Sequence, residues 1–486
     1  MSVNKANIVL FKRDLRLNDH KPLQQACGSS FPLIIIFCFE TILINDPHYD
    51  TRHWRFIWQS LQDLDQHLKQ YNSRVHIYVG NLSDTLKSIQ AEHGINTIYS
   101  HEETGVAATY QRDKALKKWC FRHKIDWKEY QKDAVIRPLS SRKNWDKEWK
   151  KAMRSELDIP DLSKANWAQL INYKEPDIPI EWKQKKSDFQ TGGTTEAYLY
   201  LNSFFDDRGI NYSKNISKPE HSRISCSRLS PYLAWGNISL REVYQTLLSH
   251  WNKKGWRRAL SALSSRLHWH CHFIQKFESE SHMEFEHFNR GYQDYPYRED
   301  LTVNRHLEAW MGGQTGYPLV DACMRCLHQT GYINFRMRAM LVSFLTHNLM
   351  IDWRQGVHHL ARLFLDFEPG IHYSQFQMQA GVVGINTIRI YNVIKQSQEQ
   401  DPEGVFIKKY VPELSSLPKE LIHTPWELTS MEQAMYDFEV GKNYPKPIVD
   451  IKETARNTRE LLWEWRKKPA VQFENQRILA RHVRPR

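Results

Sequence analysis

The chain has 486 residues, of which 41% are hydrophobic, and its formal net charge is +12 at pH 7. The length predicts two or three domains with large cores, and the lack of a long apolar run or a signal-peptide pattern argues against membrane-spanning and secreted proteins. The positive charge fits either a basic face that binds nucleic acid or a merely basic soluble protein. Seven scattered cysteines, an odd number, are typical of a reduced, cytoplasmic protein.

Short apolar strand signals alternate with helical signals over residues 1–130. Continuous apolar strands separated by helices predict a parallel sheet that is covered on both faces. No glycine-rich phosphate loop follows any of them, so we predict a doubly wound α/β domain without a recognisable phosphate site. The strand signals are Asn7 to Phe11, Pro32 to Cys38, Arg74 to Gly80 and Asn96 to Ser100, and the clearest helix between them is Arg55 to Tyr71.

The rest of the chain contains a connector and a helical region. Residues 131–203 are rich in proline and turn signals and predict a long connector between domains. From residue 204 the strand signals vanish and apolar residues recur at helical spacing, which predicts an all-helical domain over 204–486. Its last 36 residues, from Ile451, hold ten Lys/Arg against four Asp/Glu, and we expect one ending helix and a solvated basic tail there.

The stretch SRLHWHCHFIQKFE places His268, His270, Cys271 and His272 within five residues and raises the question of a metal site. Residues two apart in a helix point about 200° apart, so only His268 and His272 share a face. No H-E-x-x-H sequence surrounds them and a third ligand is not evident, so we predict no metal.

Several blocks resemble successive motifs of the DNA photolyase/cryptochrome family, in the same order. The resemblance runs from Asn7 to about Trp426. It implies FAD in the helical domain, blue-light chemistry on DNA, and a region for a second, antenna chromophore near residues 100–113. Folate, deazaflavin, a lumazine or an empty site all remain open there. The blocks are FKRDLRLNDHKPL (11–23), SRLSPYLAWGNIS (227–239), TGYPLVDACMRCLHQTGYINFRMR (315–338), DWRQG (352–356), and RIYNVIKQSQEQDPEG (389–404) followed by YVPEL (410–414).

The resemblance implies the residues that bind FAD. Hydroxyls and free backbone N–H groups at a helix start suit a diphosphate, although ordinary helix capping explains the same residues. An arginine beside the isoalloxazine needs a carboxylate partner, although a structural salt bridge is the alternative. The implied diphosphate contacts are Cys226, Ser227, Arg228, Leu229 and Ser230, and Tyr212 corresponds loosely to another FAD contact of the family. The implied flavin contacts are His270, Arg338, Asp366, Glu368 and His372.

Two of these flavin positions depart from the family pattern. His270 stands where relatives carry an arginine beside the flavin. His372 stands where photolyases usually carry asparagine near flavin N5, and we expect it to titrate near neutrality and to set the stable redox form of the flavin.

The usual chain of three tryptophans that reduces the flavin is incomplete. By ungapped counting, the position next to the flavin is Phe376, the middle one is Trp353 and the outer one is Asp300. Phenylalanine is much harder to oxidise than tryptophan, so we expect another route or poor photoreduction. Aromatic residues that could serve are Tyr373, Tyr391, Tyr332 and Trp269.

The residues at the lesion-binding positions also differ from those of relatives. Arg266 replaces a glutamate that binds the dimer in relatives, Trp269 remains as a base-stacking platform, and Met378 replaces a second tryptophan. The two histidines of (6-4) photolyases correspond to Phe335 and Ala339. We therefore expect a monomeric photolyase that uses reduced FAD to split pyrimidine dimers, of the cyclobutane type, in UV-damaged DNA. The alternatives are a cryptochrome-like photoreceptor without repair and a structural DNA-binding flavoprotein.

Overall fold

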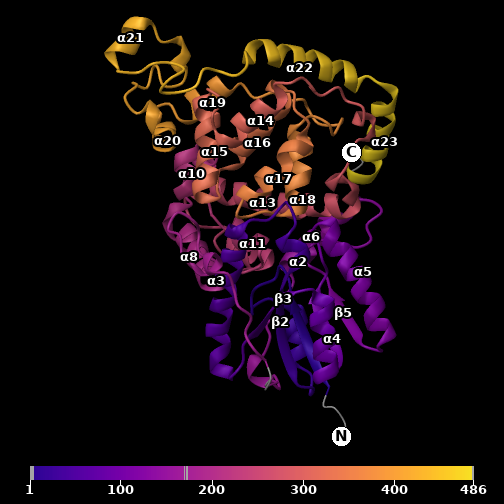
Figure 1. Cartoon of the computed structure of the whole chain (residues 1–486). Helices are drawn as coiled ribbons and strands as arrows, with labels where there is room; N and C mark the ends of the chain where they lie inside the picture. Colours follow the sequence, from indigo (N-terminus) through magenta and orange to yellow (C-terminus); the bar gives the residue numbers. More distant parts are fainter. Residues whose placement is uncertain (1–4, 169, 171–172, 484–486) are drawn as a thin grey trace.

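The computed structural model describes residues 5–168, 170 and 173–483. A five-stranded parallel sheet forms one half of the molecule and a helical region forms the other (Figure 1). The strand order is β3-β2-β1-β4-β5, which confirms the predicted doubly wound sheet and adds an edge strand that was not predicted. The strands are β1 (Ala6–Phe11), β2 (Leu33–Glu40), β3 (Val75–Gly80), β4 (Ile95–His101) and β5 (Asp126–Tyr130).

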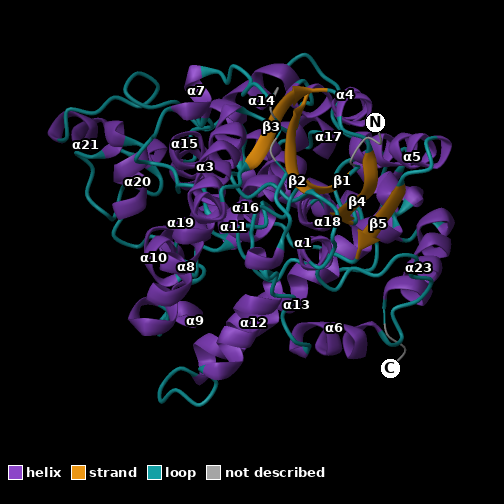
Figure 2. Cartoon of the chain, turned by 90° about the horizontal axis from the view of Figure 1, so that it is seen from below, coloured by secondary structure: helices purple, strands orange, loops and turns teal. Residues whose placement is uncertain are grey.

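Helices cover both faces of the sheet (Figure 2). Successive side chains of a strand point to opposite faces, and β1 shows the consequence. Ile8 and Leu10 pack with apolar residues of α4 and α5, whereas Val9 and Phe11 join the larger core that α1 and α3 share with part of the helical region. The helices of this half are α1 (Lys21–Cys27), α2 (Thr41–Ile44), α3 (Thr51–Leu68), α4 (Leu82–Glu92) and α5 (Ala107–Arg122).

The helical region begins at Thr194, and the segment between it and the sheet contains α6 (Trp145–Arg154) and α7 (Ile180–Lys183). Every helix of the described residues is too short or too polar to span a membrane. The remaining helices are α8 (Thr194–Ser203), α9 (Tyr212–Asn215), α10 (Pro219–Ser225), α11 (Ser230–Ala234), α12 (Leu240–Ser249), α13 (Arg257–Ser279), α14 (Val303–Gly312), α15 (Pro318–Thr330), α16 (Phe335–Ser343), α17 (Trp353–Leu363), α18 (Pro369–Gln379), α19 (Val393–Gln400), α20 (Val405–Tyr410), α21 (Ser430–Met435), α22 (Ile451–Arg466) and α23 (Pro469–His482).

Helices α13 and α18 cross closely in the middle of the helical region. A Cβ atom on Gly370 would lie 2.6 Å from the Cα of Ile274, so this approach requires glycine. One turn further on, the Ser374 hydroxyl donates to the Phe273 carbonyl at 3.3 Å. The crossing therefore fixes the two helices that carry most of the predicted lesion and flavin residues.

The loop after β1 is held by a buried hydrogen-bonded group. The Oδ2 atom of Asp14 lies 3.0 Å from Nε2 of His20 and 2.6 Å from Nδ1 of His101. The Nδ1 atom of His20 accepts the Leu23 N–H, so its Nε2 carries the proton and donates to Asp14. The three side chains are close enough to surround an ion. Because Nε2 of His20 carries a proton, however, this atom donates a hydrogen bond to Asp14, and the three side chains stabilise the loop by hydrogen bonds.

The C-terminal segment is not the solvated tail that its charge suggests. It forms α22 and α23, and α22 runs along the outer edge of the helical region (Figure 1). Leu462, Val471 and Ile478 are buried in the core. Glu280 accepts hydrogen bonds from Arg477 at 2.7 Å and from His482 at 2.9 Å, and thereby ties α23 to the end of α13. The basic residues therefore lie mainly on the outer faces of two packed helices.

Candidate active site

Arg338 on α16 and Asp366, in the turn before α18, form a two-pronged ion pair. Both Nη atoms of Arg338 donate to the carboxylate at 2.9 Å, and its Nε donates to the Ile333 carbonyl at 3.0 Å. Burial raises the pKa of Asp366, but Arg338 outweighs it and leaves the pKa below the ordinary value. The Ser230 hydroxyl also stabilises this charged carboxylate. The predicted pair is therefore present and charged, next to the start of α11.

The segment 226–230 has an unusual backbone. Arg228 adopts φ +60°, and its guanidinium lies 3.7 Å from the Tyr332 ring centroid and donates to Gln190 at 2.7 Å. Arg208 donates to the carbonyl groups of Cys226 and Ser227, so these carbonyls are already occupied. Arg228 is thus held by protein partners. The segment itself continues directly into the short helix α11.

Three buried polar atoms near this pair have no hydrogen-bond partner in the described part of the chain. They are Nη1 of Arg13, Nδ1 of His270 and Oε1 of Glu368. Glu368 also lies 3.4 Å from the guanidinium of Arg13, and both side chains influence the pKa of His270. Unpaired buried polar atoms are costly, so such a group fits a polar cofactor edge. These residues therefore fit the FAD that the sequence predicts.

His372 differs from the expectation in its charge. Burial lowers its pKa to about 3, so the ring is neutral at physiological pH and does not titrate near neutrality. The Nε2 atom donates to the Val357 carbonyl at 2.9 Å, and Nδ1 therefore carries the lone pair.

The predicted lesion residues line one side of α13. Trp269 is 43% exposed and its ring lies 5.3 Å from that of Phe273. Arg266 lies over the Phe335 ring at 5.6 Å. Burial raises the pKa of Tyr212 and the Arg266 guanidinium opposes this rise, so Arg266 also reaches the predicted cofactor contact Tyr212. An exposed tryptophan and a cation beside a second exposed ring make a surface suited to bases.

Met378 and Trp353 lie deeper in the helical region, whereas Asp300 lies at its surface. Met378 is partly buried at the end of α18 and packs against the core of the helical region. Trp353 is fully buried, 6.4 Å from the Phe376 ring, whereas Asp300 is exposed. The structure therefore places a buried phenylalanine beside the middle tryptophan of the usual route.

The histidines of the HWHCH stretch diverge. His268 contacts Asp146 at 3.0 Å, and His272 accepts a hydrogen bond from Arg142 at 3.1 Å. The Nδ1 atom of His270 is buried and has no hydrogen-bond partner among the described residues. His268 and His272 therefore bind different partners, Asp146 and Arg142.

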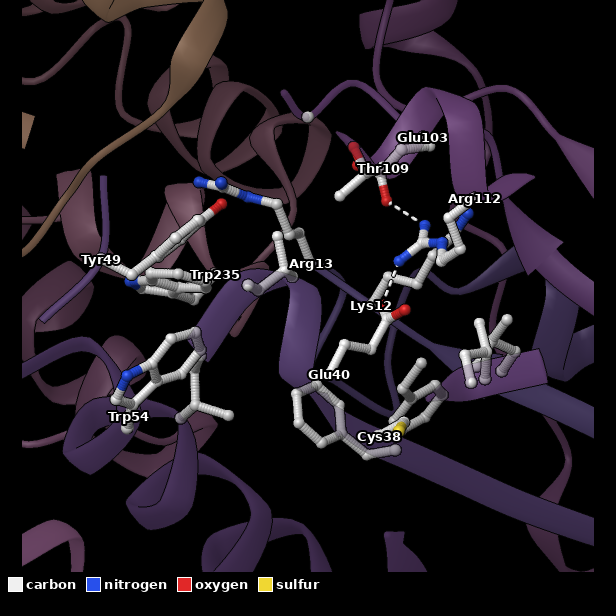
Figure 3. Close-up of a pocket in the computed structure, with 17 residues that line it drawn as sticks. Lys12, Arg13, Cys38, Glu40, Tyr49, Trp54, Glu103, Thr109, Arg112 and Trp235 are labelled. Atoms are coloured by element: carbon white, nitrogen blue, oxygen red, sulfur yellow. Dashed lines mark hydrogen bonds and ion pairs between the residues drawn. The ribbon is translucent and has the colours of Figure 1, made fainter. Parts of the chain in front are cut away.

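The α/β half contains a cavity, which the sequence indicated only through the segment 100–113 (Figure 3). Its polar side is Arg112, which pairs with Glu40 and contacts Glu103 at 2.7 Å. Its apolar side includes Tyr49, Trp54 and Trp235. Arg112 belongs to the segment 100–113, but Glu40, at the end of β2, had no sequence signal.

Arg13 is the site residue that sequence reasoning missed. It lines this cavity and lies over the Trp235 ring at 4.6 Å, while its guanidinium reaches Glu368. Its place inside the block 11–23 was visible, but its contact lies more than 300 residues away in the chain. A Cβ on Gly236 would lie 2.4 Å from the carbonyl oxygen of Arg13, so a glycine is needed for this approach.

Comparisons with known proteins agree with this geometry. Residues 7–152 match the family model for DNA photolyase, and residues 262–464 match the model for the FAD binding domain of DNA photolyase. Cryptochrome-2 of Arabidopsis thaliana is 30% identical, with 94% of this chain and 78% of that protein covered. Cryptochrome DASH of Synechocystis is 28% identical (93% and 97% covered), and a deoxyribodipyrimidine photo-lyase of Alkalihalophilus pseudofirmus is 27% identical (91% and 94% covered).

Solved structures extend the similarity to the fold. The crystal structure of the Synechocystis cryptochrome has a TM-score of 0.85 at 26% identity and covers 95% of this chain and 100% of that chain. An archaeal photolyase from Sulfolobus tokodaii, solved with two FAD molecules, has a TM-score of 0.79 at 26% identity, with 94% and 100% covered. The sequence matches and the shared fold show that this chain, with its FAD-binding domain, belongs to the DNA photolyase/cryptochrome family.

Proposed function

We propose that this chain is a light-dependent DNA photolyase that splits cyclobutane pyrimidine dimers in UV-damaged DNA. The observation that carries the proposal is the exposed ring of Trp269 on α13, flanked by Phe273 and by the Arg266–Phe335 contact. A tryptophan is expensive to leave in water, and a flipped base is an occupant that such a platform stacks against.

The residues have separable roles in this proposal. Bound FAD in its reduced form supplies the light-absorbing electron donor. Arg338, held by Asp366, keeps a positive charge where the cofactor gains negative charge, and Glu368 and His270 offer their unpaired polar atoms to its edge. His372 presents a lone pair at Nδ1 and therefore accepts a hydrogen bond without delivering a proton at neutral pH.

On the lesion side, Trp269 would stack on the extruded dimer and Met378 would pack against it. The guanidinium of Arg266 would donate hydrogen bonds to the pyrimidine carbonyl oxygens, which become more negative when the dimer gains an electron. This assigns to a cation the positioning role that a carboxylate has in relatives. The segment 226–230, at the start of α11, would hold the FAD diphosphate.

The decisive experiment is a repair assay on a defined lesion. Protein with chemically reduced FAD is mixed with an oligonucleotide that contains one cyclobutane dimer, kept in light or in darkness, and analysed by HPLC. We expect restored thymines only in light, and loss of repair in Arg266→Ala with FAD content retained. Absence of light-dependent repair by the unaltered, FAD-loaded protein would refute the proposal.

A photoreceptor without repair is the second candidate. It is favoured by the buried Phe376 beside Trp353 and by the reversed charge at Arg266. The same oligonucleotide assay separates the two, because a receptor changes its flavin spectrum in light and leaves the dimer intact. The dark arm identifies a DNA-binding flavoprotein without photochemistry.

The cavity of Figure 3 is our candidate for an antenna chromophore. Its aromatic wall of Tyr49, Trp54 and Trp235 suits a flat ring system, and Arg112 with its carboxylates suits polar ring substituents. Heat release of chromophores from the purified protein, followed by absorbance, would identify the occupant. A sample that releases FAD alone, in one equivalent, would contradict a second site of this kind.

A further inference from the structure

A hydrogen-bonded chain of two buried side chains, His48 and Tyr373, and the partly exposed Asp46 links the loop after α2 to α18. The Nδ1 atom of His48 lies 2.5 Å from Oδ1 of Asp46, and its Nε2 lies 2.5 Å from the hydroxyl of Tyr373. His48 is 2% exposed and Tyr373 is fully buried. The partners are 325 residues apart in sequence, so the fold assembles this chain of contacts.

The direction of the hydrogen bonds is fixed. Oδ1 of Asp46 accepts the backbone N–H of His48 at 3.0 Å as well as its Nδ1–H. A carboxylate cannot donate, so Nδ1 carries a proton, and in the neutral imidazole Nε2 offers its lone pair to Tyr373. The phenol therefore donates to His48, and a base backed by a carboxylate stands ready to take its proton.

A second tyrosine–histidine pair nearby has the opposite direction. The Tyr297 hydroxyl lies 3.0 Å from Nε2 of His287, and Arg354 donates to Nδ1 of His287 at 2.8 Å. Burial and Arg354 lower the pKa of His287 to about 3, so the ring is neutral. Nδ1 then holds the lone pair, Nε2 holds the proton, and His287 donates to Tyr297. His287 therefore cannot accept a proton from Tyr297 at Nε2.

Trp353 lies between the two pairs. Its ring centroid is 6.2 Å from that of Tyr373 and 6.0 Å from that of His287. The Tyr373 ring is also 5.8 Å from His372, the residue assigned to the flavin edge. Tyr373 thus lies beside both His372, a predicted flavin contact, and the remaining tryptophan, Trp353.

We propose that Tyr373 is the internal electron donor that replaces the interrupted tryptophan route, and that His48 is its proton acceptor. The inference rests on FAD binding in the helical region, not on repair. With FAD bound, Tyr373 would supply one electron to the light-excited, oxidised flavin, either directly or by reducing Trp353 after Trp353 has been oxidised. Its O–H bond breaks and the proton moves to Nε2 of His48, which leaves a neutral phenoxyl radical and an imidazolium beside Asp46. An external thiol later returns the electron, and the proton returns from His48.

The proton acceptor decides between the two tyrosines. Burial raises the pKa of Tyr373 far above its ordinary value, and the carboxylates of Glu284 and Asp46 raise it further, so the group starts as a neutral phenol. Oxidation without proton loss would create a buried cation, which is costly away from water. His48 removes that cost at Tyr373, whereas His287 offers no such relief at Tyr297.

The test uses the full-length, FAD-loaded protein with oxidised flavin. Transient absorption and electron paramagnetic resonance after a blue flash should show a tyrosyl radical, which forms more slowly in D₂O. Tyr373→Phe should lose this radical, and His48→Gln should lose it while keeping the phenol. The matched control Tyr297→Phe should retain it. A radical that persists in Tyr373→Phe, or that disappears in Tyr297→Phe, would overturn the proposal.

A second readout is independent of light. Selective ¹⁵N labelling of histidine should find the proton of His48 on Nδ1 and that of His287 on Nε2, and the reverse at His48 would refute the mechanism. The repair assay with chemically reduced, unaltered protein needs no internal donor. A failure of repair alongside a normal tyrosyl radical would therefore count against the proposed function and in favour of this inference.

Discussion

Replacing Asp366 by asparagine removes a negative charge and nearly preserves the shape of the side chain. Arg338 then loses a partner that accepts two hydrogen bonds at 2.9 Å, in a place where the Asp366 side chain is only 6% exposed. Removal of one partner of a buried ion pair costs about 3–5 kcal/mol. The Arg338 side chain is 24% exposed and keeps its bond to Ile333, so we expect the lower end, about 3 kcal/mol.

The assay is urea unfolding of the FAD-free protein, followed by tryptophan fluorescence, with Asp300→Asn as the matched control. Asp300 is exposed, and an asparagine there can still accept the hydrogen bonds from Thr302, so its replacement should cost less stability than Asp366→Asn. The folded-state pKa of Asp366 is lowered, so the folded chain binds fewer protons than the unfolded chain in acid. The stabilisation is present above about pH 4 and is lost as the pH falls, and Asp366→Asn should flatten this acid limb. Equal unfolding midpoints for Asp366→Asn and Asp300→Asn at pH 7 would refute the reasoning.

Three further outcomes are expected. Trp269→Ala should weaken binding of dimer-containing DNA by about 1–3 kcal/mol, roughly 5- to 150-fold, in fluorescence anisotropy, whereas Trp463→Ala on α22 should not; equal affinities would contradict the stacking role. Burial raises the pKa of Glu280 but its hydrogen bonds to His482 and Arg477 lower it to about 2, so it contributes about 2–3 kcal/mol that is lost as the pH falls from about 5 to about 2. Hydrogen exchange in α23 should therefore accelerate in Glu280→Gln at pH 7, and unchanged protection would argue against this anchor. Because the pKa of His372 is about 3, the rate of flavin photoreduction should show no His372-dependent step between about pH 6 and 8, and a step there that disappears in His372→Asn would show a charged ring.

Features that depend on neighbouring residues in the chain could be predicted from the sequence. Features that depend on contacts between distant residues could not. The strand at Asn7 to Phe11 is a continuous apolar run that is buried on both faces, so its signal was clear. The missed strand β5 reads DWKEY, and as an edge strand it remains largely exposed and lacks such a run. In the C-terminal helices, the count of basic residues concealed a buried stripe that includes Leu462 and Ile478.

The predicted flavin-binding residues show the same difference between local features and long-range contacts. Arg338 and Asp366 were assigned through blocks that resemble a family, and the structure joins them. The charge of His372 could not be assigned from sequence, because it depends on burial and on the Val357 carbonyl. The contact of His48 with Tyr373 had no sequence signal either, since only the packing of α18 against the loop after α2 creates it.

Arg13 connects the two halves of the molecule by direct contacts. Its side chain lines the cavity of the α/β half and stacks on Trp235, while its guanidinium donates to the Phe367 carbonyl and reaches Glu368. Transfer of excitation energy between two chromophores depends on their separation and on the angle between them. A residue that contacts both sites, and that is itself buried, would hold that separation and angle constant. The two sites would then behave as one rigid unit, and a substitution at Arg13 should disturb both of them together.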